Sequence, residues 1–301
     1  MIIAITGGTG FIGTHLTNML GQRGHDLIIL TRDPKKYAGR IHPKRSYLSV
    51  DSEMDQAIEG CDAIINLAGE NLVARRWTRS VKEELINSRA GLTARLVNAI
   101  KKAGKKPSVL ISASAAGYYG SRGDDVLTEE EPPGSDFGAQ ICVRWEAEAN
   151  KAKEWGVRVV SPRFGIPLET DGGAFAKMLT PFKLFVGGPI GRGTQYFPWI
   201  HMRDLCNSVI HALEDNNMQG PYNVASPNQV TMDEFASALG QILKRPSVFR
   251  VPEFGLRLAF GEGGMAMTAS TRLEPAAITA QGFKFEYPKL DDALRSLLDK
   301  R

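Results

Sequence analysis

Short apolar segments alternate with longer amphipathic stretches along the first half of the chain. The apolar segments are rich in β-branched residues, whereas residues 80–101 and 137–154 repeat their apolar positions with helical spacing. Short buried strands between amphipathic helices are typical of a parallel sheet with helices on both faces. Because crossovers between parallel strands are right-handed, the pattern predicts an α/β fold with a doubly wound parallel sheet. The expected strands are residues 2–6, 26–31, 46–50, 63–67, 108–112 and 157–162.

The pattern changes after Arg163, where glycine and proline become frequent and loops interrupt the periodic segments. A helix that begins with Thr231-x-x-Glu234 has the spacing of a capping box. We therefore expect a core in residues 1–165 and a mixed segment in residues 166–301 that completes the core and forms a smaller, ligand-facing lobe. Helices are expected at residues 174–182, 204–214 and 231–243, and strands at 221–225 and 283–287.

A glycine turn follows the first predicted strand directly. Gly7, Gly10 and Gly13 have the spacing G-x-x-G-x-x-G, and Gly8 adds G-x-G-x-x-G, just before an amphipathic helix. Glycine permits the tight turn, lets backbone N–H groups approach a pyrophosphate, and lets the helix pack close to the strand. The helix N-terminus adds the positive end of its dipole. This segment predicts a dinucleotide-binding site, and the alternative is a turn that only packs.

The end of the second predicted strand distinguishes NAD from NADP. An acidic residue at this point bonds to the ribose 2′-hydroxyl, whereas an arginine accommodates a 2′-phosphate. The chain has Thr31-Arg32-Asp33 here. Arg32 offers a planar fork of donors and Thr31 a hydroxyl, which together favour NADP. Asp33 is the competing signal for NAD, one position late, and an ordinary turn is the third interpretation.

Charge and composition exclude several other classes. The 37 basic and 33 acidic residues are well mixed, with a net charge of +4, which is not typical of a nucleic-acid-binding surface. No apolar stretch reaches the ~18–20 residues that a membrane span needs. Cys61, Cys142 and Cys206 are isolated, and no set of acidic and histidine residues has metal-ligand spacing, so no metal site is expected. With no signal segment before the first strand, a cytoplasmic location is expected.

Further strings carry a resemblance to a known family. Asn66-Leu67-Ala68-Gly69 follows the fourth predicted strand, and Ser112-Ala113-Ser114 with Tyr118-Tyr119-Gly120 follows the fifth. With the glycine turn, these motifs resemble the extended, epimerase-like branch of the short-chain dehydrogenase/reductase superfamily. Strings such as Trp199-Ile200-His201 narrow the resemblance to bacterial epimerase family proteins of the YfcH type, which are similar to NAD-dependent epimerases and dehydratases. The resemblance spans essentially the whole chain, and the family name is not itself evidence of epimerase chemistry.

The resemblance implies a Rossmann-type NADP-binding fold with a small C-terminal substrate lobe. It also implies an unknown small-molecule substrate and a homodimer formed through the two long helices. Glu84 and Arg89 are candidate cofactor contacts, although an ordinary helix face explains both equally well. The other cofactor contacts that it implies are Gly7, Thr9, Gly10, Phe11, Ile12, Gly13, Thr31, Arg32, Leu67, Ala68, Gly69 and Ile166.

The chain departs from the superfamily at the catalytic pair. Hydride-transferring members use Tyr-x-x-x-Lys, in which the lysine lowers the pKa of the tyrosine that exchanges a proton with the substrate oxygen. No tyrosine here has a lysine four residues later, and the corresponding helix reads Asp136-Phe137-Gly138-Ala139-Gln140-Ile141. The candidate substitutes are Ser114, which could hold a substrate oxygen, and Tyr118 or Tyr119, while Asp136 is either a base or the N-cap of the helix.

Two functional hypotheses follow. The intact cofactor signals favour an NADP-dependent oxidoreductase or epimerase-like enzyme that acts on a small molecule. The missing pair favours a nucleotide-binding sensor or scaffold that has lost the chemistry. In the lobe, His201 is either structural or a general acid or base, and the candidates for lining a pocket are Lys177, Tyr196, Phe197 and Trp199.

Overall fold

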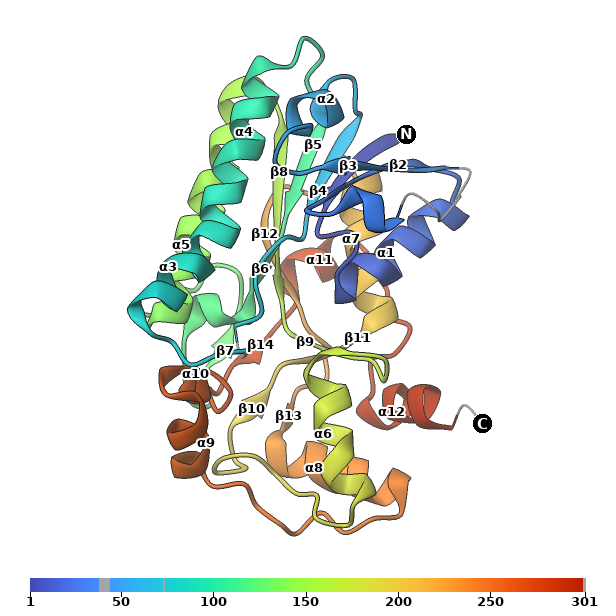
Figure 1. The fold of residues 1–301 in the computed structure, drawn as a ribbon. Helices are drawn as coiled ribbons and strands as arrows, with labels where there is room; N and C mark the ends of the chain where they lie inside the picture. Colours follow the sequence, from blue (N-terminus) through green and yellow to red (C-terminus); the bar gives the residue numbers. More distant parts are fainter. Residues whose placement is uncertain (38–43, 73, 300–301) are drawn as a thin grey trace.

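A parallel β-sheet forms the centre of the molecule in a computed structural model that describes residues 1–37, 44–72 and 74–299 (Figure 1). The strands run in the order β12-β8-β5-β4-β1-β2-β3, and β6 also pairs with β8. All of these pairings are parallel. The chain winds outward from β1 in both directions, which confirms the doubly wound sheet. The strands are β1 (Ile2–Thr6), β2 (Asp26–Thr31), β3 (Arg45–Ser49), β4 (Ala63–Asn66), β5 (Val109–Ser112), β6 (Ser114–Ala115), β8 (Arg158–Phe164) and β12 (Gly220–Val224).

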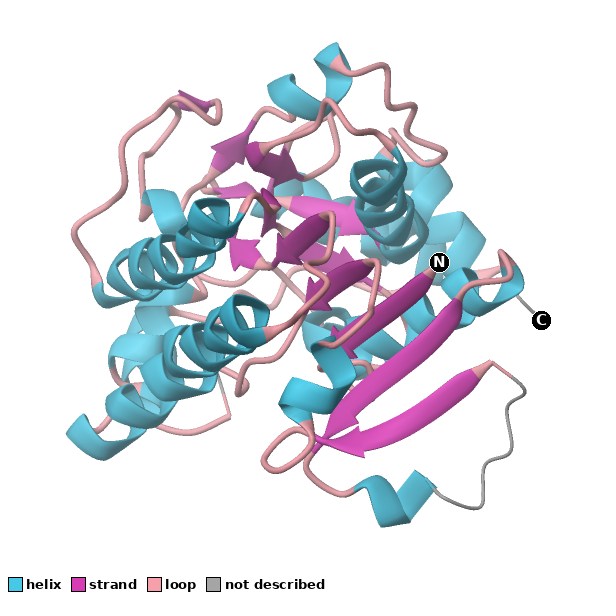
Figure 2. Ribbon diagram, turned by 90° about the horizontal axis from the view of Figure 1, so that it is seen from above, coloured by secondary structure: helices cyan, strands magenta, loops and turns pink. Residues whose placement is uncertain are grey.

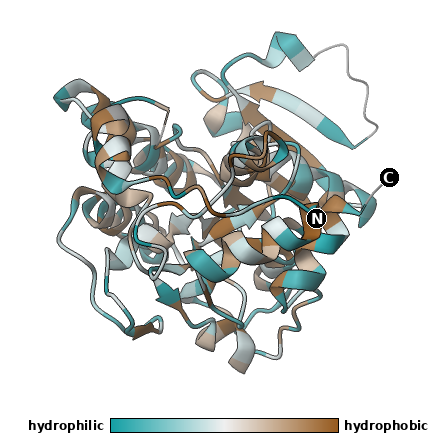
Figure 3. Cartoon of the chain, turned by 90° about the horizontal axis from the view of Figure 1, so that it is seen from below, coloured by the Kyte–Doolittle hydropathy of each residue, from teal (hydrophilic) through white to brown (hydrophobic). Residues whose placement is uncertain are grey.

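Helices cover both faces of the sheet because its strands are apolar on both sides (Figure 2). Ile3 and Ile5 belong to the cluster under α1 and α7, whereas Ala4 between them belongs to the cluster under α2 and α4. The helices themselves carry separate apolar and polar faces (Figure 3). Within the described residues, no helix is long and apolar enough to cross a membrane. The helices are α1 (Phe11–Gln22), α2 (Met54–Ile58), α4 (Leu92–Lys102), α5 (Phe137–Asn150), α7 (Met202–Glu214) and α11 (Ala276–Ala280).

The expected helix at residues 80–101 is interrupted. It consists of α3 (Arg79–Ile86), a π-helical turn at Asn87–Gly91 and then α4. Thr78 caps α3 by accepting a hydrogen bond from the N–H of Val81 at 3.3 Å. A π turn inserts one extra residue into a helix and often lies at a functional site.

A second layer of elements below the sheet forms the lobe (Figure 1). Its own apolar core contains Phe175, Phe235 and Trp199, separate from the clusters that flank the sheet. The strand β12 returns from this half of the chain to the sheet, where it pairs with β8. The short strands β7 (Val126–Leu127) and β14 (Arg272–Leu273) pair with each other in parallel. The lobe elements are β9 (Ile166–Leu168), α6 (Gly173–Lys183), β10 (Tyr196–Phe197), β11 (Trp199–His201), β13 (Val230–Thr231), α8 (Met232–Leu243), α9 (Glu253–Phe260), α10 (Glu262–Ala266) and α12 (Leu290–Leu298).

The strand expected at residues 283–287 is wrong. The backbone N–H groups of Glu286 and Tyr287 donate to the carboxylate of Asp204, at 2.8 and 2.9 Å, instead of to a neighbouring strand. Asp204 is fully buried near the start of α7. Burial raises the pKa of this carboxyl, and the two backbone donors act in the opposite direction. The apolar alternation at Phe283 and Phe285 reflects packing against the main core rather than membership of a sheet.

The capping box of α8 is present as expected. Thr231 Oγ1 accepts from the N–H of Glu234 at 3.3 Å, and the Glu234 carboxylate accepts from the N–H of Thr231 at 2.7 Å. We expect Thr231→Ala to lower the free energy of unfolding by about 1 kcal/mol, because the N–H of Glu234 loses its side-chain acceptor. Urea unfolding would measure this loss. Thr194→Ala, at an exposed threonine, is the control, and an equal loss in both variants would contradict the prediction.

Candidate functional site

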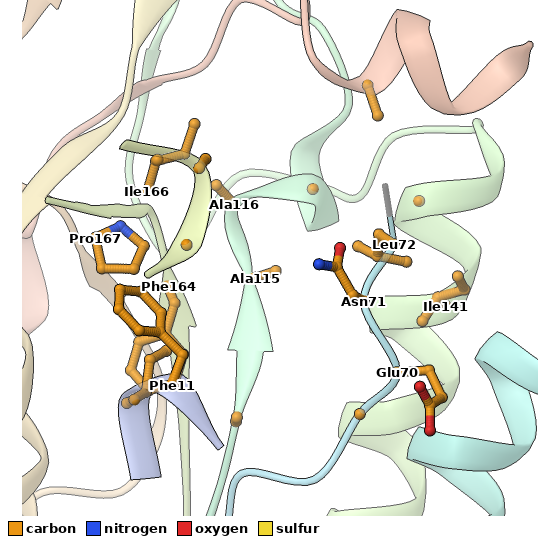
Figure 4. Close-up of a pocket in the computed structure, with 18 of the residues that line it drawn as sticks. Phe11, Glu70, Asn71, Leu72, Ala115, Ala116, Ile141, Phe164, Ile166 and Pro167 are labelled. Carbon is orange, nitrogen blue, oxygen red and sulfur yellow. The ribbon is translucent and has the colours of Figure 1, made fainter. Parts of the chain in front are cut away.

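A cavity of about 1500 Å³ opens at the carboxyl ends of the central strands, between the sheet and the lobe. In the sheet order, β1 lies between β4 and β2, so the cavity occupies the point where the winding direction reverses. Ligands of open α/β sheets bind at such a point. Figure 4 shows Phe11, Ile166 and Pro167 on one side of the cavity and Leu72 and Ile141 on the other. The lobe closes it with α6, α9 and the segment after α10.

The glycine turn forms a tight cradle beneath this cavity. Gly7 has a φ of +69°, and a Cβ there would lie 2.7 Å from the carbonyl carbon of Leu67. A Cβ at Gly13 would lie 2.1 Å from the carbonyl oxygen of Gly7, so only glycine lets α1 pack this closely. Gly10 is the N-cap of α1, and no side chain caps the helix. The first-turn N–H groups therefore have no side-chain acceptor and suit an anion.

At the end of β2, the arginine rather than the aspartate lines the cavity. Thr31 and Arg32 are lining residues, and the Arg32 side chain is 81% exposed. Asp33 is not among the lining residues, and its carboxylate accepts from the N–H of Lys36 at 3.2 Å. Arg32 Nη1 lies 2.7 Å from Glu70 Oε1. A cationic fork beside the glycine cradle favours a 2′-phosphate over a free 2′-hydroxyl.

The π-helical turn places Arg89 under the segment that follows β4. Arg89 Nη2 donates to the carbonyl of Glu70 at 2.7 Å, and Nη1 donates to that of Leu85 at 3.3 Å. Arg89 is buried, which lowers the pKa of its guanidinium. A Cβ at Gly69 would lie 2.9 Å from the guanidinium carbon, so the arginine supports this stretch of backbone directly. Arg89 thus holds one wall of the cavity in position.

Of the cofactor candidates from the sequence, all but Glu84 line the cavity. Glu84 lies on α3 and forms an ion pair with Arg75 away from the cavity. Whether the lining residues touch a cofactor stays a prediction. The lining candidates are Gly7, Thr9, Gly10, Phe11, Ile12, Gly13, Thr31, Arg32, Leu67, Ala68, Gly69, Arg89 and Ile166.

Ser114 lines the cavity at the end of the sheet, but its hydroxyl proton is already used in a hydrogen bond within the protein. Its hydroxyl donates to Glu146 Oε1 at 2.6 Å. Glu146 in turn accepts two hydrogen bonds from Arg163, at 2.9 Å each. Burial acts to lower the pKa of the Arg163 guanidinium, and the hydrogen bonds and charge of Glu146 outweigh it, so that pKa is raised. Ser114 therefore has acceptor lone pairs rather than a free proton to offer a ligand.

The two tyrosines after β5 face away from the cavity. The Arg163 guanidinium carbon lies 3.4 Å from the centre of the Tyr118 ring, and Tyr118 is not a lining residue. The Tyr119 hydroxyl donates to Asn223 Oδ1 at 2.7 Å and accepts from Arg163 at 2.8 Å. Burial raises the pKa of Tyr119 to about 12. Catalytic roles for Ser114 and Tyr118 stay predictions, and this geometry favours Ser114.

Glu146 and Arg163 are the polar residues that the sequence reasoning missed. Arg163 is the next-to-last residue of a strand whose other inner positions are mostly apolar, and it is 2% exposed. A charged residue inside such a strand is a signal for a buried partner. The identity of that partner on α5 could not be read from the sequence.

The helix that would carry the Tyr-x-x-x-Lys pair has no equivalent chemistry at the cavity. Ile141 lines the cavity, the Phe137 ring packs against Trp77, and Gln140 bonds to the carbonyl of Ser135. Asp136 caps α5 by accepting from the N–H of Ala139 at 2.9 Å. The helix therefore presents no tyrosine–lysine pair to the cavity, and the residues of this segment that line it are Asp136, Gly138, Ile141, Cys142 and Trp145.

Among the lobe candidates, Lys177, Tyr196 and Phe197 line the cavity, as expected. The expectation for Trp199 is wrong, because its ring is buried in the core of the lobe. His201 is structural in this arrangement. Its Nδ1 accepts from the N–H of Arg203 at 3.1 Å and its ring stacks on Tyr287 at 4.0 Å.

Comparisons with known proteins give the family of the chain. A model of the NAD-dependent epimerase/dehydratase family matches residues 3–225, and a model of a domain of unknown function matches residues 251–297. The epimerase family protein SDR39U1 homolog of Arabidopsis thaliana is 38% identical, over 99% of this chain and 87% of that protein. The epimerase family protein YfhF of Bacillus subtilis is 36% identical, over 100% and 99%.

A solved structure of a relative extends the comparison to three dimensions. The crystal structure of human epimerase family protein SDR39U1, isoform 2, with NADPH matches with a TM-score of 0.91 and 34% sequence identity. The match covers 100% of both chains, so sheet and lobe correspond together. The family model matches residues 3–225, and relatives that are 36–38% identical match nearly the whole chain. The chain therefore belongs to the NAD-dependent epimerase/dehydratase family.

Proposed function

We propose that this protein binds NADPH in the cavity and acts as an oxidoreductase or epimerase-like enzyme on a small molecule. The observation that carries the proposal is the position of Arg32, which lines the cavity beside the glycine cradle while Asp33 does not. The human relative with the same fold was crystallised with NADPH. NADPH supplies a hydride when bound.

The residues of the cavity fit each part of such a cofactor. The uncapped first turn of α1 and the glycine backbone would hold the pyrophosphate, since N–H groups and a helix dipole favour an anion there. Arg32, with the hydroxyl of Thr31, would hold the 2′-phosphate through charge-assisted hydrogen bonds. Leu67 and Ala68, directly above Gly7, would limit how far the cofactor moves across the strand ends.

Ser114 would hold the reacting oxygen of the substrate. Because its own proton goes to Glu146, its free lone pairs accept a hydrogen bond from a substrate hydroxyl. Glu146, neutralised by Arg163, keeps the serine in this orientation. The arrangement therefore positions an alcohol, or the alcohol product of a carbonyl reduction, at the end of the sheet.

The test combines binding with turnover. We expect calorimetry to show tighter binding of NADPH than of NADH, and we expect the protein to oxidise members of a panel of alcohols, with the hydride passing to NADP and the hydroxyl proton passing to water. In Ser114→Ala, turnover should fall about 100-fold while NADPH affinity is unchanged, since the serine orients the reacting oxygen only. Ser135→Ala, at an exposed serine before α5, is the matched control. Full turnover in Ser114→Ala would remove the serine from the mechanism.

A second candidate function is a nucleotide-dependent sensor. The supporting observation is that the hydroxyls of Ser114 and Tyr119 are both committed to internal hydrogen bonds. A sensor would bind NADPH and NADP with different affinities and change its hydrogen-exchange protection without turnover. Equal binding of both, with identical protection, would exclude it. A cytoplasmic location and a homodimer stay predictions from the sequence.

A further inference from the structure

We infer that the lobe half of the cavity binds a substrate with an apolar body and one reactive oxygen, not a sugar linked to a nucleoside diphosphate. This inference rests on the proposed function and adds the chemical class of the substrate. It follows from three features of the cavity: the apolar walls, the positions of the cationic groups, and the apolar mouth.

The walls of the lobe half are mostly apolar. One face of α6 contributes Met178, Pro181 and Phe182, and α9 contributes Leu256 and Phe260. Leu72 and Ile141 also line the cavity, across from Phe11, Ile166 and Pro167 (Figure 4). Apolar walls favour an apolar ligand through the area removed from water. The remaining apolar lining comes from Val186, Ile190, Phe197, Met232, Val251, Ala266 and Met267.

Two polar lining groups on this side, Gln195 and Asp136, already have partners within the protein, and the other uncharged polar side chains of this lining are Asn71, Tyr196 and Thr271. Gln195 Nε2 donates to the carbonyl of Ile190 at 2.6 Å, and its Oε1 accepts from the N–H of Gly193 at 2.7 Å. Asp136 caps α5. A ligand rich in hydroxyl groups would leave many of them without partners here, which is costly in a closed site.

Among the described lining residues, the three arginines lie in the cofactor half of the cavity. Arg32 and Arg89 flank the segment after β4, and Arg95 donates to the carbonyl of Val50 at 2.7 Å. In the described part of the lobe, Lys177 is the lining cation, on the same face of α6 as Met178 and Pro181.

No arginine of the lobe lines the cavity among the described residues, and two of them form ion pairs within the lobe. Arg250 bonds to Asp233 at 2.9 Å, and Arg192 lies 3.7 Å from Glu253. Neither lines the cavity. A diphosphate requires charge-assisted donors that neutralise two charges, and the lobe walls among the described residues supply none beyond Lys177.

The apolar surface continues out of the cavity. Val186 and Val251 line it and are also 52% and 37% exposed, so they lie at its mouth. Hydrogen bonds hold their two segments together, from Phe249 N to the carbonyl of Gly187 at 3.1 Å and from Val251 N to that of Pro189 at 2.9 Å. Beyond the mouth, large apolar side chains stay exposed: Leu184, Phe185, Val248, Phe249, Phe254 and Leu258. Exposed apolar side chains beside the mouth of a cavity are typical of a ligand entrance.

Two leucines on α9 provide a matched test. Leu256 lines the cavity and is 8% exposed, whereas Leu258 lies on the outer face and is 75% exposed. The apolar fluorophore N-phenyl-1-naphthylamine should bind the NADPH-saturated protein, and Leu256→Asp should weaken that binding about 10-fold or more. Leu258→Asp should change it less than about 2-fold. Met178→Gln, from α6, should also weaken binding and serves as a second variant if Leu256→Asp does not fold.

Parallel titrations separate this inference from the proposed function. NADPH affinity, measured first for every variant, should equal that of the wild type. If the wild type fails to bind NADPH, the proposed function fails. If NADPH binds, UDP-glucuronic acid binds and the fluorophore does not, the apolar substrate class is overturned while the proposed function stands. An equal loss of fluorophore binding in Leu256→Asp and Leu258→Asp would place the fluorophore on the outer surface and would also overturn the inference.

Discussion

Replacing Glu146 with alanine is expected to lower the free energy of unfolding by about 3–5 kcal/mol. The variant leaves Arg163, which is 2% exposed, as a buried charge without its carboxylate. It also removes the acceptor of the Ser114 hydroxyl. Guanidinium unfolding followed by circular dichroism measures the loss, and NADPH affinity of the folded fraction shows whether the cavity stays intact.

The same helix supplies the control. Glu148 pairs with Lys151 at the surface, where ion pairs contribute about 0–1 kcal/mol, so Glu148→Ala should have little effect. The double variant Glu146→Leu with Arg163→Met should be more stable than Glu146→Ala alone, because no unpaired charge is buried. If Glu146→Ala were as stable as the wild type, the ion pair would not hold the end of the sheet together.

Replacing Arg32 with alanine should weaken NADPH binding about 10- to 100-fold, which corresponds to the loss of one or two charge-assisted hydrogen bonds to a phosphate. NADH lacks the 2′-phosphate, so its affinity should change less than about 3-fold. Calorimetric titration of both nucleotides into both proteins measures the difference. The effect should shrink at high salt because Arg32 is exposed.

Arg79→Ala is the control for a general change in charge. Arg79 is an exposed arginine on α3 that pairs with Glu83 and does not line the cavity. It should leave both affinities unchanged. Equal weakening of NADPH and NADH by Arg32→Ala would mean that Arg32 acts on the fold of the cavity and not on the 2′-phosphate.

The parts of the fold that depend on local pattern were predictable. The strands at Ile2–Thr6 and Asp26–Thr31 lie where the apolar runs placed them, and the capping box at Thr231 forms as its spacing indicated. The glycine turn could be predicted because a side chain at Gly7 or Gly13 would collide with the backbone, so the spacing of glycines appears directly in the sequence. The strand expected at residues 283–287 was wrong because its backbone partner, Asp204, lies on another element.

The sequence by itself determined the α/β class, the glycine cradle, the candidacy of Arg32 as a phosphate ligand and the absence of a Tyr-x-x-x-Lys pair. Each of these depends on residues that are neighbours in the chain. Only the tertiary structure decided that Arg32 rather than Asp33 lines the cavity, and that Glu146 engages Ser114. It also decided that distant lobe segments such as Met178 and Leu256 form one apolar wall. These outcomes depend on which side chains meet across the fold, and a linear pattern does not specify such contacts.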